Sequence, residues 1–350
     1  MINNLTFQEK YKIIGTKDPS FEGSFITAVK TTGIFCRPSC RARKPKAENV
    51  IFYQTPKEAI QHGYRPCKVC KPMHKLDETP EYIQEIIKEL HDNPYLRIKD
   101  QGLRERGIEP SKIRRWFKKH HQITFHAYQR MLRINTAFSR IGQGDRITDT
   151  AMDSGYGSLS GFNERYHAIF GEAPTSLNQK TVINLVRFTT PIGPMFAGAT
   201  SQGLCLLEFT DRRMLETEFK DLRKRLNSVI LPGETEILTQ TQTELAQYFE
   251  GKRKDFSIPL DTPGTDFQQS VWQVLQEIPY GETRSYKQQA IAIDNPKAVR
   301  AVASANGHNR VAIIIPCHRV IGSDGSLTGY GGGLQRKQWL LDLEKTYANL

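Results

Sequence analysis

The spacing of apolar residues divides the chain into three stretches. Residues 1–76 show no sustained period, which predicts a short, loop-rich domain. Across 79–176 apolar residues recur at three- and four-residue steps, the period of helices that bury one face. From residue 182 the pattern alternates over 182–188 and 204–209, which predicts strands, before a further helical stretch begins.

The middle stretch predicts a first helix followed by two pairs of short helices. These helices are expected over 82–90, 98–106, 111–120, 147–154 and 158–170. On one of them Ile113, Trp116 and Phe117 share a buried face, and Lys112 and Arg115 point toward solvent. A short helix, a glycine-containing turn and a second helix with a basic face are typical of a helix-turn-helix unit. A generic helical bundle would show the same spacing, so both interpretations stay open at this point.

Length and composition exclude several classes of protein. A chain of 350 residues is too long for one ordinary core, so two to four domains are expected. No stretch approaches the roughly 20 apolar residues that span a bilayer, and the polar start over 1–17 lacks the apolar block of a secretory signal. We therefore expect a cytoplasmic protein without a membrane partner. We also expect a monomer.

The net charge of +12 is concentrated near the N-terminus, where residues 1–80 hold 14 Lys and Arg against 7 Asp and Glu. Such an excess attracts polyanions, and DNA or RNA is the usual one. A basic surface that is merely solvated is the alternative, and charge alone does not separate the two.

Four cysteines in this basic region have the spacing of a metal site. Three residues separate Cys36 from Cys40, and two separate Cys67 from Cys70. Two such pairs can place four sulfurs around one Zn²⁺ ion, and disulfides are the poorer explanation in a reducing compartment. A purely structural zinc ion is the usual meaning of such a site.

The residues around these cysteines change that interpretation. The runs Phe25–Arg43, Asn49–Tyr53 and Gly63–Cys70 are similar, nearly residue for residue, to the N-terminal domain of the Ada family. The resemblance implies that Cys36 is both a zinc ligand and the acceptor of a methyl group from a methylated DNA phosphate. Zinc keeps a thiolate deprotonated near pH 7, which makes this chemistry reasonable. Nearby arginines are candidates to contact the flanking phosphates: Arg37, Arg41, Arg43 and Arg65.

The second helix pair carries a further resemblance. The run Ile147–Tyr156, followed by Phe162, Tyr166 and Pro174, resembles the second helix-turn-helix of AraC-family regulators. The resemblance implies promoter binding by residues 78–178, with Lys112 and Arg115 as candidate DNA contacts and RNA polymerase as a partner.

Near the C-terminus the apolar run 311–315 meets Pro316-Cys317-His318. By itself this predicts a strand or core segment that ends in a small buried cysteine. Capping-box spacing at Thr265 and Ser285, and Asn295 followed by proline, predict three helix starts, the last two forming a third helix-turn-helix. Cys205 lies in a strand-like run and is expected to be an inert, packed residue.

The motifs of this last stretch occur in the order found in O6-alkylguanine-DNA alkyltransferases. They are 264–272, 278–286, 295–302, 316–320, 329–331 and 336–344. The resemblance implies that Cys317 accepts an alkyl group from a flipped base, that His318 activates it, and that Glu344 orients the imidazole.

The resemblance to alkyltransferases also implies roles for four other residues: Asn309 braces the turn, Arg300 fills the vacated base stack, and Tyr286 and Tyr330 contact the base. Arg310 stands where a proline is common, and Gly331 and Gly332 replace larger side chains, so a less rigid turn and a wider pocket are expected.

The sequence therefore predicts an α+β multidomain protein. The expected parts are a four-cysteine zinc domain (1–77), an all-α AraC-type double helix-turn-helix (78–178), a ribonuclease H-like α/β subdomain (180–263) and a winged helix-turn-helix catalytic subdomain (264–350). The predicted activity is single-turnover methyl transfer from O6-methylguanine and O4-methylthymine to Cys317, and from phosphotriesters to Cys36, which then switches on transcription. The alternative is a non-enzymatic AraC-type regulator that senses metal or redox state, and Pro316-Cys317-His318 with Glu344 argues against it.

Overall fold

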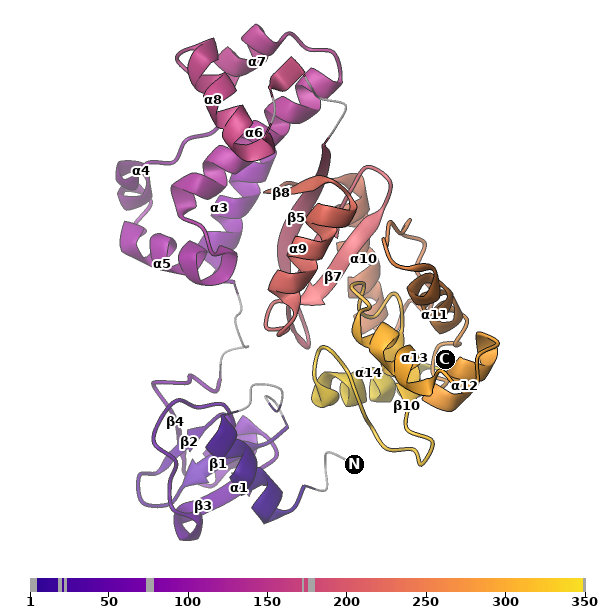
Figure 1. The fold of residues 1–350 in the computed structure, drawn as a ribbon. Coiled ribbons are helices and arrows are strands. Elements are labelled where there is room, and N and C mark those ends of the chain that lie inside the picture. The colour runs from indigo at the N-terminus through magenta and orange to yellow at the C-terminus, as the bar shows by residue number, and fades with distance from the viewer. Residues whose placement is uncertain are drawn as a thin grey trace.

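The computed structural model describes residues 5–17, 21, 24–73, 79–171, 173–175 and 180–348. Figure 1 shows a small sheet at the N-terminal end, a group of helices, and a mixed α/β part that continues to the C-terminus. The multidomain α+β fold class predicted from the sequence is confirmed. Among the described residues, no helix is both long and apolar enough to cross a membrane.

The N-terminal part is built on a four-stranded sheet that the apolar pattern did not predict. Its elements are α1 (Phe7–Thr16), β1 (Ile26–Val29), β2 (Ile34–Cys36), the 3-10 turn Ala47–Asn49, β3 (Val50–Tyr53), α2 (Pro56–Gln61) and β4 (Arg65–Pro66). The strand order is β3-β1-β2-β4, and β2 runs parallel to β4. Because Cys36 ends β2 and Cys67 follows β4, this pairing brings the two cysteine pairs together.

The middle part is all helical, as predicted. Its helices are α3 (Glu81–Asp92), α4 (Asp100–Glu105), α5 (Pro110–His121), α6 (Phe125–Gly142), α7 (Ile147–Asp153) and α8 (Leu159–Phe170). Ile113, Trp116 and Phe117 are buried together on α5. The pattern missed α6, where buried polar residues such as Gln129 and Asn135 interrupt the apolar period.

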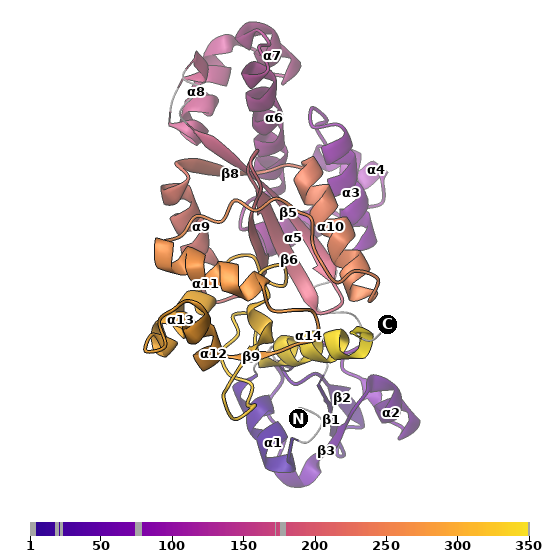
Figure 2. The ribbon, with the colours of Figure 1, turned by 90° about the vertical axis from the view of Figure 1, so that its right-hand side faces the viewer.

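A second four-stranded sheet follows. Its elements are β5 (Thr181–Thr190), β6 (Gly193–Ala199), β7 (Leu204–Phe209), α9 (Leu215–Arg225), β8 (Ser228–Pro232) and α10 (Glu236–Phe249), in the strand order β7-β6-β5-β8. Helix α9 packs on one face of the sheet and α10 on the other (Figure 2). Cys205 is fully buried against α9, and burial raises its pKa to about 12, as expected for a packed residue.

The helical part also packs against this sheet, which the sequence did not predict. Helix α6 lies beside the edge strand β8, and Leu231 of that strand is buried with Ile134 of the helix. Asn135 Nδ2 donates to Asn184 Oδ1 at 2.6 Å and to the carbonyl of Pro232 at 2.9 Å. The two parts therefore share a packed and hydrogen-bonded interface.

The C-terminal part contains the predicted third helix-turn-helix. Its elements are α11 (Asp266–Gln276), β9 (Arg284–Ser285), α12 (Tyr286–Ala292), α13 (Val299–Gly307), the 3-10 turn Cys317–Arg319, β10 (Val320–Ile321) and α14 (Leu334–Tyr347). Both predicted capping boxes, at Thr265 and Ser285, are present. The predicted start at Asn295 is wrong, because Asn295 lies in a turn and α13 begins at Val299.

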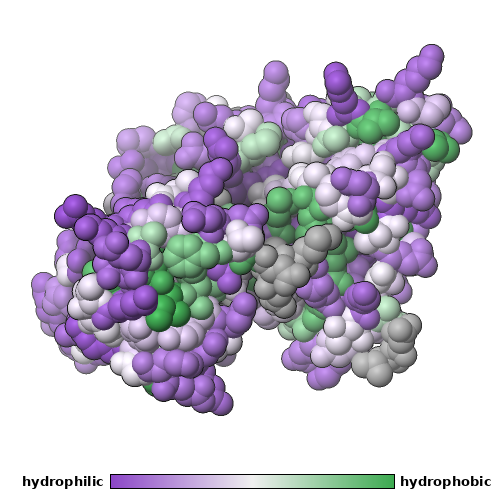
Figure 3. Space-filling view, turned by 90° about the horizontal axis from the view of Figure 1, so that it is seen from below, coloured by the Kyte–Doolittle hydropathy of each residue, from purple (hydrophilic) through white to green (hydrophobic). Residues whose placement is uncertain are grey.

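The apolar run 311–315 is core but not a strand. Val311 makes one isolated bridge to Leu207, and Ile313 has a φ of 73°, which turns the chain out of an extended path. All five residues of the run are buried. Figure 3 views the molecule from below, and there hydrophobic residues lie in small patches among hydrophilic ones.

Candidate metal centre and candidate active site

The four predicted zinc ligands converge on one point. The sulfur atoms of Cys36, Cys40, Cys67 and Cys70 all lie within 4.8 Å of one another, and none of the four forms a disulfide. Four thiolates around Zn²⁺, with Zn–S bonds of about 2.3 Å, form a tetrahedron whose edges are about 3.8 Å. The donor set and its size therefore fit one zinc ion, and the predicted cofactor site is confirmed.

The four sulfurs differ in burial and in their hydrogen bonds, and Cys36, Cys40 and Cys70 are all partly buried. Cys67 is buried, whereas Cys36 is only partly buried. The backbone N–H of Arg37 donates to Cys70 Sγ at 3.4 Å, which withdraws charge from that sulfur rather than from Cys36.

The predicted phosphate contacts near this site differ in their surroundings. Arg37 donates from Nε to the carbonyl of Cys70 and from Nη2 to that of Lys71, both at 3.0 Å, so its guanidinium is held on the cysteine loop. Arg43 and Arg65 are exposed. Lys112 and Arg115 are exposed on α5, opposite its buried face. Contact between these residues and DNA stays a prediction.

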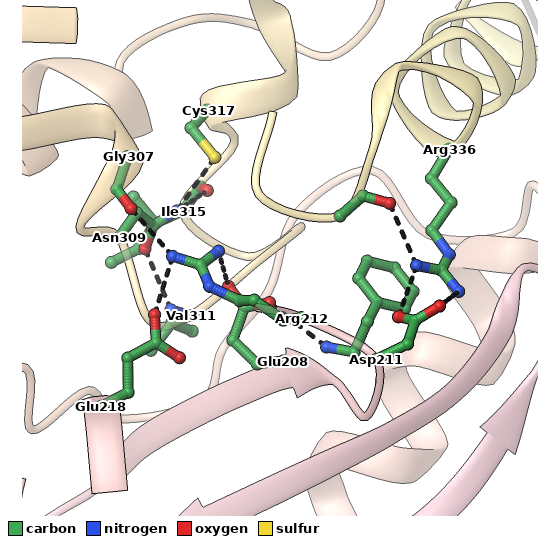
Figure 4. A network of polar contacts seen from close by, with 12 residues as sticks. Glu208, Asp211, Arg212, Glu218, Gly307, Asn309, Val311, Ile315, Cys317 and Arg336 are labelled. Atoms are coloured by element: carbon green, nitrogen blue, oxygen red, sulfur yellow. Dashed lines mark hydrogen bonds and ion pairs between the residues drawn. The ribbon is translucent and has the colours of Figure 1, made fainter. Parts of the chain in front are cut away.

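Cys317 lies in the 3-10 turn that follows the buried run, and it is 9% exposed. Asn309 Nδ2 donates to Cys317 Sγ at 3.3 Å and to the carbonyl of Ile315 at 2.8 Å, while Asn309 Oδ1 accepts from the N–H of Val311 at 3.0 Å (Figure 4). Asn309 thus spans the turn and holds the sulfur. Burial raises the pKa of the Cys317 thiol, so the resting site holds a thiol.

Glu344 is the centre of a buried hydrogen-bond network. His318 Nε2 lies 2.8 Å from Glu344 Oε1, and both side chains are fully buried. Arg319 donates to both carboxylate oxygens at 2.9 Å, and Tyr248 donates to Oε1 at 2.7 Å. Although burial raises the pKa of Glu344, the contacts with His318 and Arg319 outweigh it and hold that pKa far below its usual range.

This network fixes the chemistry available to His318. Burial lowers the pKa of His318, which leaves the imidazole neutral, with the Nε2 proton donated to Glu344. Its Nδ1 is buried without a hydrogen-bond partner among the described residues, so it is a free acceptor for a proton. No hydrogen bond joins Cys317 to His318 in the described part of the chain, so activation of the sulfur through His318 stays a prediction.

The tyrosines predicted to contact the base lie close to the loop 329–333. Tyr286 donates through its hydroxyl to the carbonyls of Thr328 at 3.1 Å and Gly329 at 3.3 Å. The ring of Tyr330 lies 6.5 Å from that of His318 and perpendicular to it. Tyr330 therefore reaches the active site, and Tyr286 holds the loop that carries Tyr330.

Two departures from the alkyltransferase pattern are compensated in the structure. Arg310 Nη1 donates to the carbonyl of Pro263 at 2.6 Å, and its guanidinium pairs with Asp221, so this turn is anchored without a proline. A side chain on Gly331 would overlap with the guanidinium of Arg212, and one on Gly332 would overlap with Phe209. The space beside both glycines is thus already filled, and the expected widening of the pocket does not occur on that side.

Several residues of the site were not found from the sequence. Arg319 and the buried Lys337 lie inside the motifs 316–320 and 336–344 but were given no role, whereas Tyr248 and Arg212 lie far from both motifs along the chain. Lys337 donates through Nζ to the carbonyls of Val320 at 2.5 Å and Thr328 at 2.7 Å. These two hydrogen bonds connect α14 to the segment between Val320 and Thr328.

Arg300 is exposed near the start of α13. We expect Arg300→Ala to slow methyl transfer from O6-methylguanine in duplex DNA by about tenfold and to leave transfer from the free base nearly unchanged, because the side chain matters only where a base stack must be refilled. Single-turnover rate constants on the two substrates measure this. Equal losses on both would contradict the stacking role.

Four sequence families match consecutive parts of the chain. They are the metal binding domain of Ada (9–73), a helix-turn-helix domain (103–180), the ribonuclease-like domain of 6-O-methylguanine DNA methyltransferase (187–262) and the DNA binding domain of that methyltransferase (266–346). The four cysteines lie in the first of these matches, and Cys317 lies in the last.

Three proteins illustrate what this chain is similar to. The bifunctional transcriptional activator/DNA repair enzyme Ada of Escherichia coli is 34% identical over 350 residues, covering 97% of each chain. A methylated-DNA--protein-cysteine methyltransferase of Mycobacterium bovis is 48% identical over 159 residues, covering 45% of this chain and 90% of that protein. The crystal structure of Mycobacterium tuberculosis OGT in complex with DNA covers 47% of this chain and 94% of its own, at 43% identity and a TM-score of 0.40. Because the match to Ada covers 97% of both chains at 34% identity, this chain belongs to the Ada family.

Proposed function

We propose that this protein repairs alkylated DNA by two irreversible methyl transfers, one to Cys317 and one to Cys36, and that methylated Cys36 activates transcription. The observation that carries the proposal is the environment of Cys317. Asn309 donates a hydrogen bond to the sulfur of Cys317, and the next residue along the chain, His318, is hydrogen-bonded to Glu344. The match to Ada over the whole chain supports the same combination of activities. O4-methylthymine is the second base substrate.

Base repair follows from the burial of Cys317. A sulfur this enclosed cannot reach a base inside a duplex, so the base must be flipped out, with Arg300 filling the gap and Tyr286 and Tyr330 contacting the base. His318 Nδ1 takes the thiol proton, and Glu344 stabilises the imidazolium that forms. The sulfur attacks the methyl carbon, and the bond from that carbon to O6 of guanine breaks. N1 of the released base takes up one proton as the C6–O6 carbonyl forms, which balances the proton lost by the thiol. The products are a thioether on Cys317 and unmodified guanine, and the protein acts once.

Backbone repair uses the cysteine cluster. Zinc bound by the four cysteines would keep their sulfurs ionised at neutral pH. Cys36, partly exposed at the end of β2, attacks the methyl carbon of a phosphotriester, and the phosphate oxygen leaves as the ordinary diester anion. Arg37, Arg43 and Arg65 are proposed to hold the flanking phosphates.

Each part of the chain has a role in this proposal. We assign promoter binding to residues 78–178 through Lys112 and Arg115, zinc chemistry to 1–77, and base repair to 180–263 with 264–350. RNA polymerase is the proposed partner at the promoter, and the protein acts as a monomer in the cytoplasm.

The test is incubation of the protein with DNA that carries labelled methyl groups, followed by mapping of the label. We expect label on Cys317 from O6-methylguanine and on Cys36 from phosphotriesters. The alternative, a regulator that only senses metal or redox state, predicts no label on either cysteine.

A further inference from the structure

Arg212 lies between the sheet and the active site, and the mechanism above does not use it. It follows β7 and precedes α9, and its side chain is 5% exposed. Nη1 donates to Glu208 Oε1 at 2.6 Å, and Nη2 lies 2.7 Å from Glu218 Oε1 and donates to the carbonyl of Gly307 at 2.8 Å (Figure 4). One guanidinium thus connects three separate elements: β7, α9 and α13.

The contact with Gly307 leads directly to the acceptor cysteine. Gly307 ends α13, where helix carbonyls have no partner within the helix and a cation is favourable. Asn309, two residues later, donates to Cys317 Sγ. The position of the helix end therefore decides where the Asn309 side chain meets the sulfur.

A second contact reaches the opposite wall of the pocket. The guanidinium of Arg212 fills the space beside Gly331, in the loop that carries Tyr330. The neighbouring Asp211 pairs with Arg336 at the start of α14, at 2.8 and 3.0 Å, and so anchors the turn from which Arg212 projects. The Asp211–Arg336 pair thus fixes the turn that carries Arg212, and Arg212 contacts both the end of α13 and the loop 329–333.

Charge gives a further reason to assign Arg212 a role. Burial raises the pKa values of Glu208 and Glu218, and the positive charge of Arg212 lowers both, so the two carboxyls and the guanidinium form one coupled, buried cluster. A buried ion pair is weak evidence for stability, because desolvation offsets its attraction. The positive charge of Arg212 lowers the pKa of Cys317, opposing the effect of burial.

We propose that Arg212 is a positioning residue for methyl transfer, which holds the end of α13 and supports the loop 329–333 so that Asn309 and Tyr330 keep the geometry Cys317 needs. This inference rests on the proposed role of Cys317 as the methyl acceptor.

The test separates DNA binding from chemistry. Arg212→Met is expected to lower the single-turnover rate constant at saturating methylated duplex by about tenfold to a hundredfold, and to leave the Kd for that duplex within about twofold. The loss should also occur with free O6-methylguanine, because the defect lies at Cys317. Arg212→Lys, which keeps the charge, should recover part of the rate. Arg106→Met is the control, since Arg106 pairs with Glu89 in the helical part of the chain, and it should behave as the wild type.

Rates equal to wild type in both Arg212 variants, below their melting temperatures, would overturn the inference, as would a weaker Kd with an unchanged rate constant. If Arg212→Met does not fold, Gly331→Ala replaces it, because its methyl group displaces the guanidinium without removing the charge. A wild-type protein that transfers no methyl group to Cys317 would instead refute the proposed function, so the two failures are distinguishable.

Discussion

Replacing Cys317 with alanine is expected to abolish methyl transfer from O6-methylguanine. The change removes the sulfur that Asn309 holds at 3.3 Å, and among the described residues no other cysteine lies in this active site. Transfer from phosphotriesters to Cys36 should persist at the wild-type rate, because Cys36 belongs to a separate sheet and cysteine cluster. Transfer of labelled methyl groups from each type of lesion, measured separately, checks both parts.

Cys205→Ala is the matched control for this variant. Cys205 is also a fully buried cysteine, but it packs against α9 and its thiol donates to the carbonyl of Gly198 at 3.3 Å. Its replacement should leave both transfers intact. Residual guanine repair in Cys317→Ala would show that the acceptor has been assigned to the wrong residue.

The sequence predicted the cysteine cluster and the helix-turn-helix units because their signals are local. Ligand spacing at Cys36 and Cys40 and the capping boxes at Thr265 and Ser285 depend on residues a few positions apart. The same holds for the apolar face of α5. Such short-range patterns can be recognised in the sequence without knowledge of the tertiary fold.

What the sequence could not predict depends on distant contacts. Tyr248 reaches Glu344 across 96 residues, and Arg212 reaches Gly307 across 95. The packing of α6 on β8 joins Asn135 to Pro232 across 97 residues. The prediction that the run 311–315 forms a strand was wrong for a related reason. Apolar composition indicates that the residues are buried, but it does not indicate the left-handed backbone conformation of Ile313.

Methylation of Cys36 is expected to tighten promoter binding by about thirtyfold at low salt. Four thiolates on one Zn²⁺ carry a formal charge of −2, and conversion of one to a neutral thioether leaves −1. A unit charge about 7 Å from a phosphate, at an effective dielectric of 20, is worth about 2 kcal/mol before salt screening. The exposed Arg43 and Arg65 give this surface positive charge, which favours phosphates, so affinity is expected to rise without any large movement of the chain.

The measurement is the promoter Kd of methylated and unmethylated protein at two salt concentrations. The ratio of the two Kd values should shrink at higher salt, because screening weakens the repulsion that methylation removes. Protein methylated only on Cys317 is the control, since that change leaves the charge of the zinc cluster unaltered and should leave promoter affinity at the unmethylated value. Equal affinities of the Cys36-methylated and unmethylated proteins at both salts would rule out the electrostatic switch even with methyl transfer to Cys36 intact. A ratio that is large but independent of salt would instead require methylation to act through packing of the cysteine loop.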